Sequence, residues 1–165
     1  MQKRQKGFSL IELLIVVAII LIIAAIAIPN LLRSRIAANE ASAVGSLRTI
    51  NTAQVTYSST YPATGYASTL AVLGPGTAGN TSANSSNAVL IDFVLGCPSQ
   101  PCTKSGYLFT LSGGTPVNGA IYTYTTNADP VTQDQTGHRH FYSSTPGYIQ
   151  YNESVPATST DAPLQ

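Results

Sequence analysis

The sequence has few charged residues. Only 9% of its 165 residues are charged, whereas a typical soluble domain has about 25%. Eight lysines and arginines and seven acidic residues give a net charge of +1. This balance excludes a strongly basic nucleic-acid-binding protein and an acidic, charge-extended disordered chain. We therefore expect no specific nucleic-acid partner.

Cysteines and catalytic signatures are also scarce. Two cysteines, Cys97 and Cys102, cannot form a four-thiolate zinc site or a disulfide-dense scaffold. The sequence contains no Gly-rich phosphate loop, and neither of its histidines lies in a recognisable nucleophile motif. We expect no enzyme activity, no cofactor and no nucleotide site.

A long apolar run occupies the N-terminal region. Residues 8–28 contain only Ser9 and Glu12 as polar side chains. A helix of this length would span about 31 Å, which is the thickness of the hydrocarbon core of a bilayer. Three cations precede the run, at Lys3, Arg4 and Lys6. We therefore expect a single-pass inner-membrane precursor whose N-terminus lies in the cytoplasm.

Two other interpretations of this run exist. Ala25-Ile26-Ala27 resembles the small-x-small site of a secretory signal peptide, and cleavage there would leave a secreted binding protein that begins near Ile28. The run is longer than a usual signal peptide, however, and Glu12 lies inside it. A helix buried in a globular core is a weaker alternative, because sixteen unbroken apolar residues are hard to cover in a domain this small.

Glu12 is an ionisable residue inside an apolar span, where it carries a cost in insertion free energy. A carboxylate in hydrocarbon costs about 2.5–3.5 kcal/mol on insertion scales. No cation lies within the span to pair with it. Either Glu12 lies near the interface and reaches water, or its partner comes from another chain.

The segment Lys6-Gly7-Phe8-Ser9-Leu10-Ile11-Glu12-Leu13-Leu14 resembles the class III signal sequence of type IV pilins and type II secretion pseudopilins. The resemblance rests on Gly7, Phe8, Glu12 and Pro29. It implies a short leader of the type IVa kind, cleavage after Gly7 and N-methylation of Phe8. It also implies that Glu12 sets the register of assembly by pairing with the Phe8 amine of a neighbour, since each charge then offsets the desolvation of the other.

On this resemblance, the chain is a structural subunit of a type IV pilus. Its partners would be identical subunits in a helical filament, a prepilin peptidase and N-methyltransferase, and an inner-membrane assembly platform with a separate ATPase. The precursor would contact membrane lipid before assembly, and the filament at the cell surface would serve motility, adhesion or DNA uptake. A periplasmic type II secretion pseudopilin shares the N-terminal motif and is the alternative.

Four segments are expected along the chain. These are a leader (1–7), a transmembrane or filament-core helix (8–28), its amphipathic continuation (29–60) and a globular β head with surface loops and a C-terminal tail (61–165). Pro29 cannot donate a helical hydrogen bond and predicts a kink or local melting. An apolar stripe of helical period continues to Tyr57, so we expect one helix from about Ser9 to Tyr57.

The expected fold is α+β, with the hydrophobic half of the long helix protruding and the rest packed against an antiparallel sheet of about four strands. Segments rich in tyrosine, threonine and β-branched residues predict strands at 107–111, 121–126, 139–143 and 148–151. Thr145-Pro146-Gly147 predicts a type II turn between the last two. Residues 69–74 predict one helical turn, 74–87 a loop and 156–165 a frayed tail, while 89–95 are a helix or a strand.

Cys97 and Cys102 are predicted to form a disulfide. Two prolines between them favour a turn that brings the Cα atoms within about 4.4–6.8 Å, as a disulfide requires. The export of this segment places it where disulfides persist.

A metal site is considered at the two histidines, and we expect none. His138 and His140 alternate on a predicted strand, and the nearby carboxylates are Asp129 and Asp134. A lone His-x-His is more often a packing or surface feature, and the ligand spacing of a calcium loop is absent.

Overall fold

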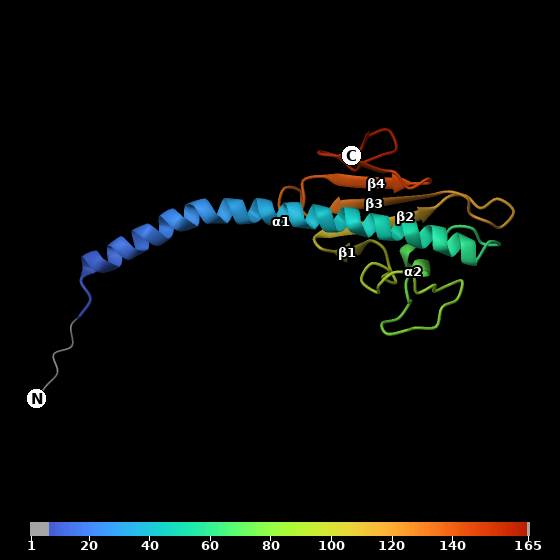
Figure 1. Cartoon of the computed structure of the whole chain (residues 1–165), viewed down its shortest axis with the longest axis horizontal. Helices are drawn as coiled ribbons and strands as arrows, with labels where there is room; N and C mark the ends of the chain where they lie inside the picture. The colour runs from blue at the N-terminus through green and yellow to red at the C-terminus, as the bar shows by residue number, and fades with distance from the viewer. Residues whose placement is uncertain (1–6, 165) are drawn as a thin grey trace, which may run out of the picture. The chain divides into compact units, whose positions relative to one another are not determined.

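The structure is a computed structural model that describes residues 7–164. The chain divides into two compact units, Met1–Arg35 and Ile36–Gln165, and each is described by itself. One helix, α1 (Leu10–Thr60), supplies residues to both units (Figure 1). The predicted helix is thus confirmed, and its bounds differ from the expected ones by one residue at the start and three at the end.

The second unit combines helices with an antiparallel sheet. Besides the C-terminal part of α1 it contains a short helix, α2 (Leu70–Leu73), and the strands β1 (Cys102–Lys104), β2 (Tyr107–Gly113), β3 (Tyr124–Pro130), β4 (His140–Ser144), β5 (Ile149–Asn152) and β6 (Ala162–Pro163). Each strand pairs with the next in the chain, in the order β1-β2-β3-β4-β5-β6. The α+β fold is confirmed, and the sheet has six strands rather than four.

The two unpredicted strands are the short edges of the sheet. β1 has three residues and β6 has two, which is too short for a visible alternation of apolar and polar residues. β6 also contains Pro163, which a sheet accepts only at an edge. The prediction of a frayed tail at 156–165 was therefore wrong for residues 156–164, because Ala162 and Pro163 pair with β5 and Ala157 is buried; residue 165 lies outside the described residues.

The predicted strands are present with shifted bounds. The largest shift is in β3, which extends to Pro130. Its residues Tyr124, Thr126 and Ala128 alternate with more exposed neighbours and are buried, although tyrosine and threonine carry hydroxyl groups. Ile121 instead forms an isolated bridge with Gly65. Residues 69–74 contain the helical turn α2, 74–87 contain no helix or named strand, and 89–95 are neither helix nor strand.

The hairpin between β4 and β5 is confirmed, but its turn differs from the predicted one. The Gly147 N–H donates to the Ser144 carbonyl. The turn therefore runs from Ser144 to Gly147, and Pro146 is its third residue. A type II turn would have had Pro146 in second place.

The core of the second unit lies between α1 and the sheet, which the helix crosses in Figure 1. The predicted stripe points into this core, since Leu47, Ile50 and Tyr57 are at most 1% exposed. They belong to the same buried cluster as Phe109 and Phe141 of the sheet. Large apolar side chains on one helix face thus fix the helix on the sheet, as burial of each stabilises by about 1.5–3 kcal/mol.

A buried ion pair fixes the helix on the sheet at a second point. Glu40 of α1 is 6% exposed, and its carboxylate accepts hydrogen bonds from the His138 N–H at 2.9 Å and the Arg139 Nε at 2.7 Å. Burial alone would raise the pKa of Glu40. The hydrogen bonds from His138 and Arg139 outweigh this effect and hold that pKa below its usual value.

We expect Glu40→Gln to lower the free energy of unfolding by about 2 kcal/mol at neutral pH. Breaking a fully buried pair costs about 3–5 kcal/mol, and the cost here is smaller because the Arg139 side chain is 34% exposed. Urea unfolding of the full chain in detergent, followed by tyrosine circular dichroism, measures the change.

The lowered pKa of Glu40 also gives this effect a pH dependence. The stabilisation is present above the unfolded-state pKa and is lost as the pH falls through the native pKa. The difference in the free energy of unfolding between Glu40→Gln and the wild type should therefore become smaller at acidic pH. Arg48→Gln is the matched control, since exposed substitutions of this kind change stability by about 0.5 kcal/mol or less. Equal unfolding midpoints for Glu40→Gln and Arg48→Gln would contradict the role of Glu40.

Candidate functional site

The predicted cleavage site lies at the exposed start of the described chain. Gly7 is exposed and Phe8 is 91% exposed, whereas residues 1–6 of the predicted leader are outside the described residues. A Cβ atom added at Gly7 would meet nothing within 4 Å. The fold itself therefore does not require glycine at this position.

Ser9 and Glu12 together cap the N-terminus of α1. The Glu12 Oε2 accepts a hydrogen bond from the Ser9 N–H at 2.9 Å, and the Ser9 Oγ accepts one from the Ile11 N–H at 3.4 Å. The Glu12 half is that of a capping box, and Ser9 caps the second N–H of the helix rather than the third. The sequence analysis missed the role of Ser9, although Ser-x-x-Glu before an apolar run is its signature.

The described part of the first unit, residues 7–35, exposes all of its large apolar side chains. From Leu10 to Leu32, no large hydrophobic residue is less than 44% exposed. α1 is long and apolar enough in this part to cross a membrane, and none of that part is buried within the structure. A helix that is apolar on all sides needs lipid or other helices around it.

α1 continues through Pro29 without a break in its helical assignment. The Asn30 side chain donates a hydrogen bond to the Ile26 carbonyl at 3.1 Å. α1 therefore continues beyond the proline to Thr60. A kink at Pro29 stays a prediction.

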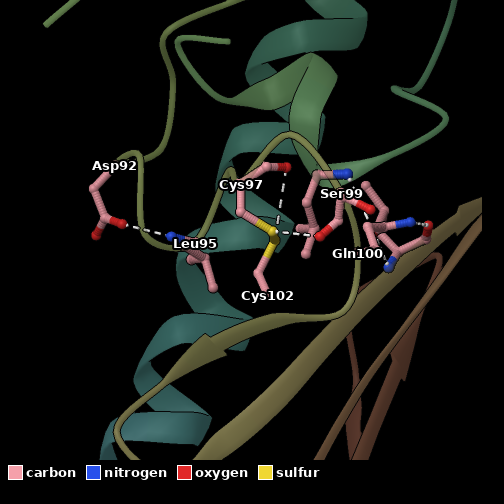
Figure 2. Close-up of a disulfide and its surroundings, with 8 residues drawn as sticks. Asp92, Leu95, Cys97, Ser99, Gln100 and Cys102 are labelled. Atoms are coloured by element: carbon pink, nitrogen blue, oxygen red, sulfur yellow. Dashed lines mark hydrogen bonds between the residues drawn. A yellow bond between two sulfur atoms is a disulfide. The ribbon is translucent and has the colours of Figure 1, made fainter. Parts of the chain in front are cut away.

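The predicted disulfide is present (Figure 2). Cys97 and Cys102 are bonded, with their Cα atoms 5.6 Å apart. Gln100 lies between them and ties their loop to β2, because its side chain accepts from the Leu111 N–H at 2.7 Å and donates to the Leu111 carbonyl at 3.0 Å. The sequence analysis did not single out Gln100, since its partner is distant in the chain.

Asp92 fixes the other side of the disulfide loop. Its carboxylate accepts from the Leu95 N–H at 2.7 Å and pairs with the Lys104 Nζ at 2.6 Å. Burial raises the pKa of Asp92, but the bonds from Lys104 and Leu95 outweigh burial and leave this pKa below its usual value. The disulfide thus closes a loop that is already held at both ends.

The two histidines do not come together as a metal site. His138 precedes β4 and contacts Asp134, with Nδ1 and Oδ1 2.6 Å apart, whereas His140 begins β4 and contacts Asp129 at the same distance. The bond to Asp134 raises the pKa of His138. Within residues 7–164, no three side chains of metal-binding type are grouped.

Comparison with known proteins gives matches at the N-terminus. Residues 2–28 match the model of the prokaryotic N-terminal methylation motif. The chain is 48% identical over 54 residues to the type IV major pilin protein PilA of Myxococcus xanthus, a match that covers 33% of this chain and 24% of that protein. It is 63% identical over 38 residues to the type IV wide pilus major component PilA4 of Thermus thermophilus, over 23% of this chain and 29% of that protein.

These matches cover a limited part of each protein. They span about a quarter of the length of the two relatives. No solved structure matches the chain. Similarity to type IV major pilins is therefore established for the N-terminal region, and the sheet is described from its own structure.

We expect the paired substitution Cys97→Ser with Cys102→Ser to lower the free energy of unfolding by about 2 kcal/mol, because the bridge closes a short loop in the unfolded chain. Urea unfolding of the full chain in detergent checks this. Reduction of the wild-type protein should give the same loss, whereas the reductant should not change the variant. Two reactive thiols in the untreated wild-type protein would contradict the bridge.

Proposed function

We propose that this chain, which carries a prepilin-type methylation motif and is similar to type IV major pilins, is a structural subunit of a type IV pilus. One observation carries the proposal. The motif stands at the start of a helix whose large apolar side chains, from Leu10 to Leu32, are all exposed. Such a surface suits a bilayer first and neighbouring helices of identical subunits afterwards.

Maturation follows from the accessible start of the chain. A prepilin peptidase cleaves after Gly7, which releases the leader (1–7), and Phe8 is then N-methylated. The methylation motif that matches residues 2–28 supports this role, and Gly7 and Phe8 are both exposed. Lys3, Arg4 and Lys6 leave with the leader, so five basic and seven acidic side chains remain.

Assembly depends on Glu12. In the precursor its carboxylate is engaged by the Ser9 N–H. After cleavage, the new amine at Phe8 offers a cationic partner of greater strength, and pairing with the amine of a neighbour offsets the cost of both charges in an apolar setting. Glu12 thereby sets the register between subunits as they leave the membrane for the filament, driven by a separate cytoplasmic ATPase at the assembly platform.

The filament at the cell surface serves motility, adhesion or DNA uptake. The relatives matched by the N-terminal region are described as major pilus components, which favours a pilus over a periplasmic pseudopilus. Imaging filaments sheared from cells and identifying their subunit by mass spectrometry tests this function. Recovery of the chain in the periplasm with no surface filament that contains it would contradict it.

We expect Gly7→Leu to block cleavage, because a branched side chain at this position obstructs the approach of the peptidase to the peptide bond. Intact-mass measurement of the membrane-extracted chain should find a precursor that begins at Met1. Gly45→Leu is the matched control, since a Cβ at Gly45 also meets nothing within 4 Å; it should be cleaved normally. A Gly7→Leu chain that starts at Phe8 would refute the site, and a wild-type chain that starts near Ile28 would indicate a secretory signal peptide.

We expect Glu12→Gln to leave cleavage intact and to reduce surface filaments about tenfold or more, because the amide can still cap the helix but cannot neutralise a neighbouring amine. Filament yield is measured by shearing and is normalised to mature chain in the membrane.

Ser9→Ala is the matched control for Glu12→Gln, because it removes the hydroxyl of the cap and keeps the charge of Glu12. It should assemble normally. Wild-type filament yield from Glu12→Gln would show that capping, and not charge pairing, is the task of this residue.

A further inference from the structure

Most charged side chains of the second unit are paired within the chain. The pairs are Arg139 with Glu40, Lys104 with Asp92, His138 with Asp134 and His140 with Asp129. Among residues 36–164, Arg48 is the lysine or arginine that forms no ion pair, and the Glu153 side chain forms no ion pair or hydrogen bond. Both side chains are exposed. Asp161 also forms no ion pair, but its carboxylate accepts hydrogen bonds from Asn152 and Thr158. Among the described residues of the unit, Arg48 and Glu153 are thus the exposed charged side chains that no other group engages.

Arg48 lies in a groove beside α1. The groove has a volume of about 320 Å³ and is lined by Arg48, Thr49, Thr52, Ala53, Thr56 and Leu90. Its threonine hydroxyls are already engaged, because each donates to the carbonyl four residues earlier at about 3.0 Å. The guanidinium is therefore the strong donor that the groove offers to a ligand, beside the partly exposed apolar side chain of Leu90.

Glu153 lies in a turn that its neighbours hold in place. The Asn152 side chain accepts hydrogen bonds from the Ser154 N–H at 3.0 Å and the Val155 N–H at 3.3 Å. The Gln133 side chain donates to the Glu153 carbonyl at 3.0 Å. Val155, two residues beyond the carboxylate, is 55% exposed. The turn 153–155 thus offers a carboxylate and an apolar side chain from an ordered backbone, which lowers the entropic cost of binding.

We propose that the groove at Arg48 binds the turn 153–155 of a second copy of this chain. The guanidinium of Arg48 pairs with the carboxylate of Glu153, a geometry that arginine and carboxylate groups favour. Val155 then covers the partly exposed apolar side chain of Leu90. The occupant is a second copy because the second unit of the same chain supplies an exposed, unengaged group of each sign, Arg48 and Glu153.

This contact has the symmetry of a filament. The groove and the turn are different patches of one molecule, so their union is head-to-tail and generates an open helical array when the rotation does not close. The inference rests on the proposed function, since it adds a contact between the sheet units of subunits that their apolar helices already hold together. In a chain with so few charges, one matched pair per contact can specify the register.

The test is a charge exchange in the full-length chain in cells. Arg48→Glu alone and Glu153→Arg alone should each lower sheared-filament yield about tenfold or more, because each places like charges in contact. The double variant restores opposite charges and should recover most of the yield. Yield is normalised to mature, disulfide-bonded chain in the membrane, which shows that each variant folds and is processed.

Arg33 and Arg35 supply the matched controls, as exposed arginines of the same helix in the other unit. Arg33→Glu and Arg35→Glu, each combined with Glu153→Arg, should not restore filaments. Rescue by either of them, or failure of the double variant at 48 and 153, would overturn the pairing. A defect in Arg48→Glu together with normal Glu153→Arg filaments would assign the groove to a different acidic partner and overturn the turn 153–155 as its occupant.

These outcomes are distinct from failure of the proposed function. If wild-type cells form no filament that contains this chain, the pilus function fails. If wild-type filaments form and Arg48→Glu filaments are equally abundant, the groove contact alone fails.

Discussion

The apolar surface of α1 between Leu10 and Leu32 must be covered by something other than its own chain. Its large side chains are all exposed, and an uncovered apolar surface of this extent is unusual for a soluble monomer. Lipid covers it at no cost, and closely packed helices of other subunits can replace lipid. In the proposed function, membrane anchoring and polymerisation are therefore two solutions of one constraint, and transfer from bilayer to filament exchanges one apolar environment for another.

In the proposed function, Glu12 is the polar group that gives this exchange a direction. A surface without polar groups would pack in many registers, since dispersion contacts between aliphatic side chains discriminate little between neighbouring positions. In the described chain the Glu12 carboxylate accepts a hydrogen bond from the Ser9 N–H. This bond partly offsets the free-energy cost of placing the carboxylate in an apolar environment before any neighbour binds. The cationic Phe8 amine of a neighbouring subunit would be a stronger partner for this carboxylate than the neutral Ser9 N–H, because hydrogen bonds between ionised groups are about twice as strong as neutral ones.

Sequence patterns predicted the elements that rest on local signals. The period of α1, the tyrosine, threonine and β-branched residues of β2, β4 and β5, and the Cys97–Cys102 turn are all visible within short segments. Patterns failed where the determinant is distant. β6 exists because β5 offers it an edge, and Glu40 meets Arg139 across 99 positions. At the candidate site, Gly7, Phe8 and Glu12 form a recognisable spacing, whereas the groove at Arg48 needs Leu90 from another segment.

The low charge of the chain bears on how subunits recognise one another. The surface of the second unit is polar mainly through hydroxyl and amide groups, many of which are already bonded to their own backbone, as Thr49 and Thr52 are. Such groups keep the unit soluble but select weakly among partners. Where most charges are paired internally, an unpaired Arg48 and an unpaired Glu153 meet little competition, and mismatched contacts that bury either one alone are penalised. Scarcity of charge thus gives specificity to the few charges that remain free.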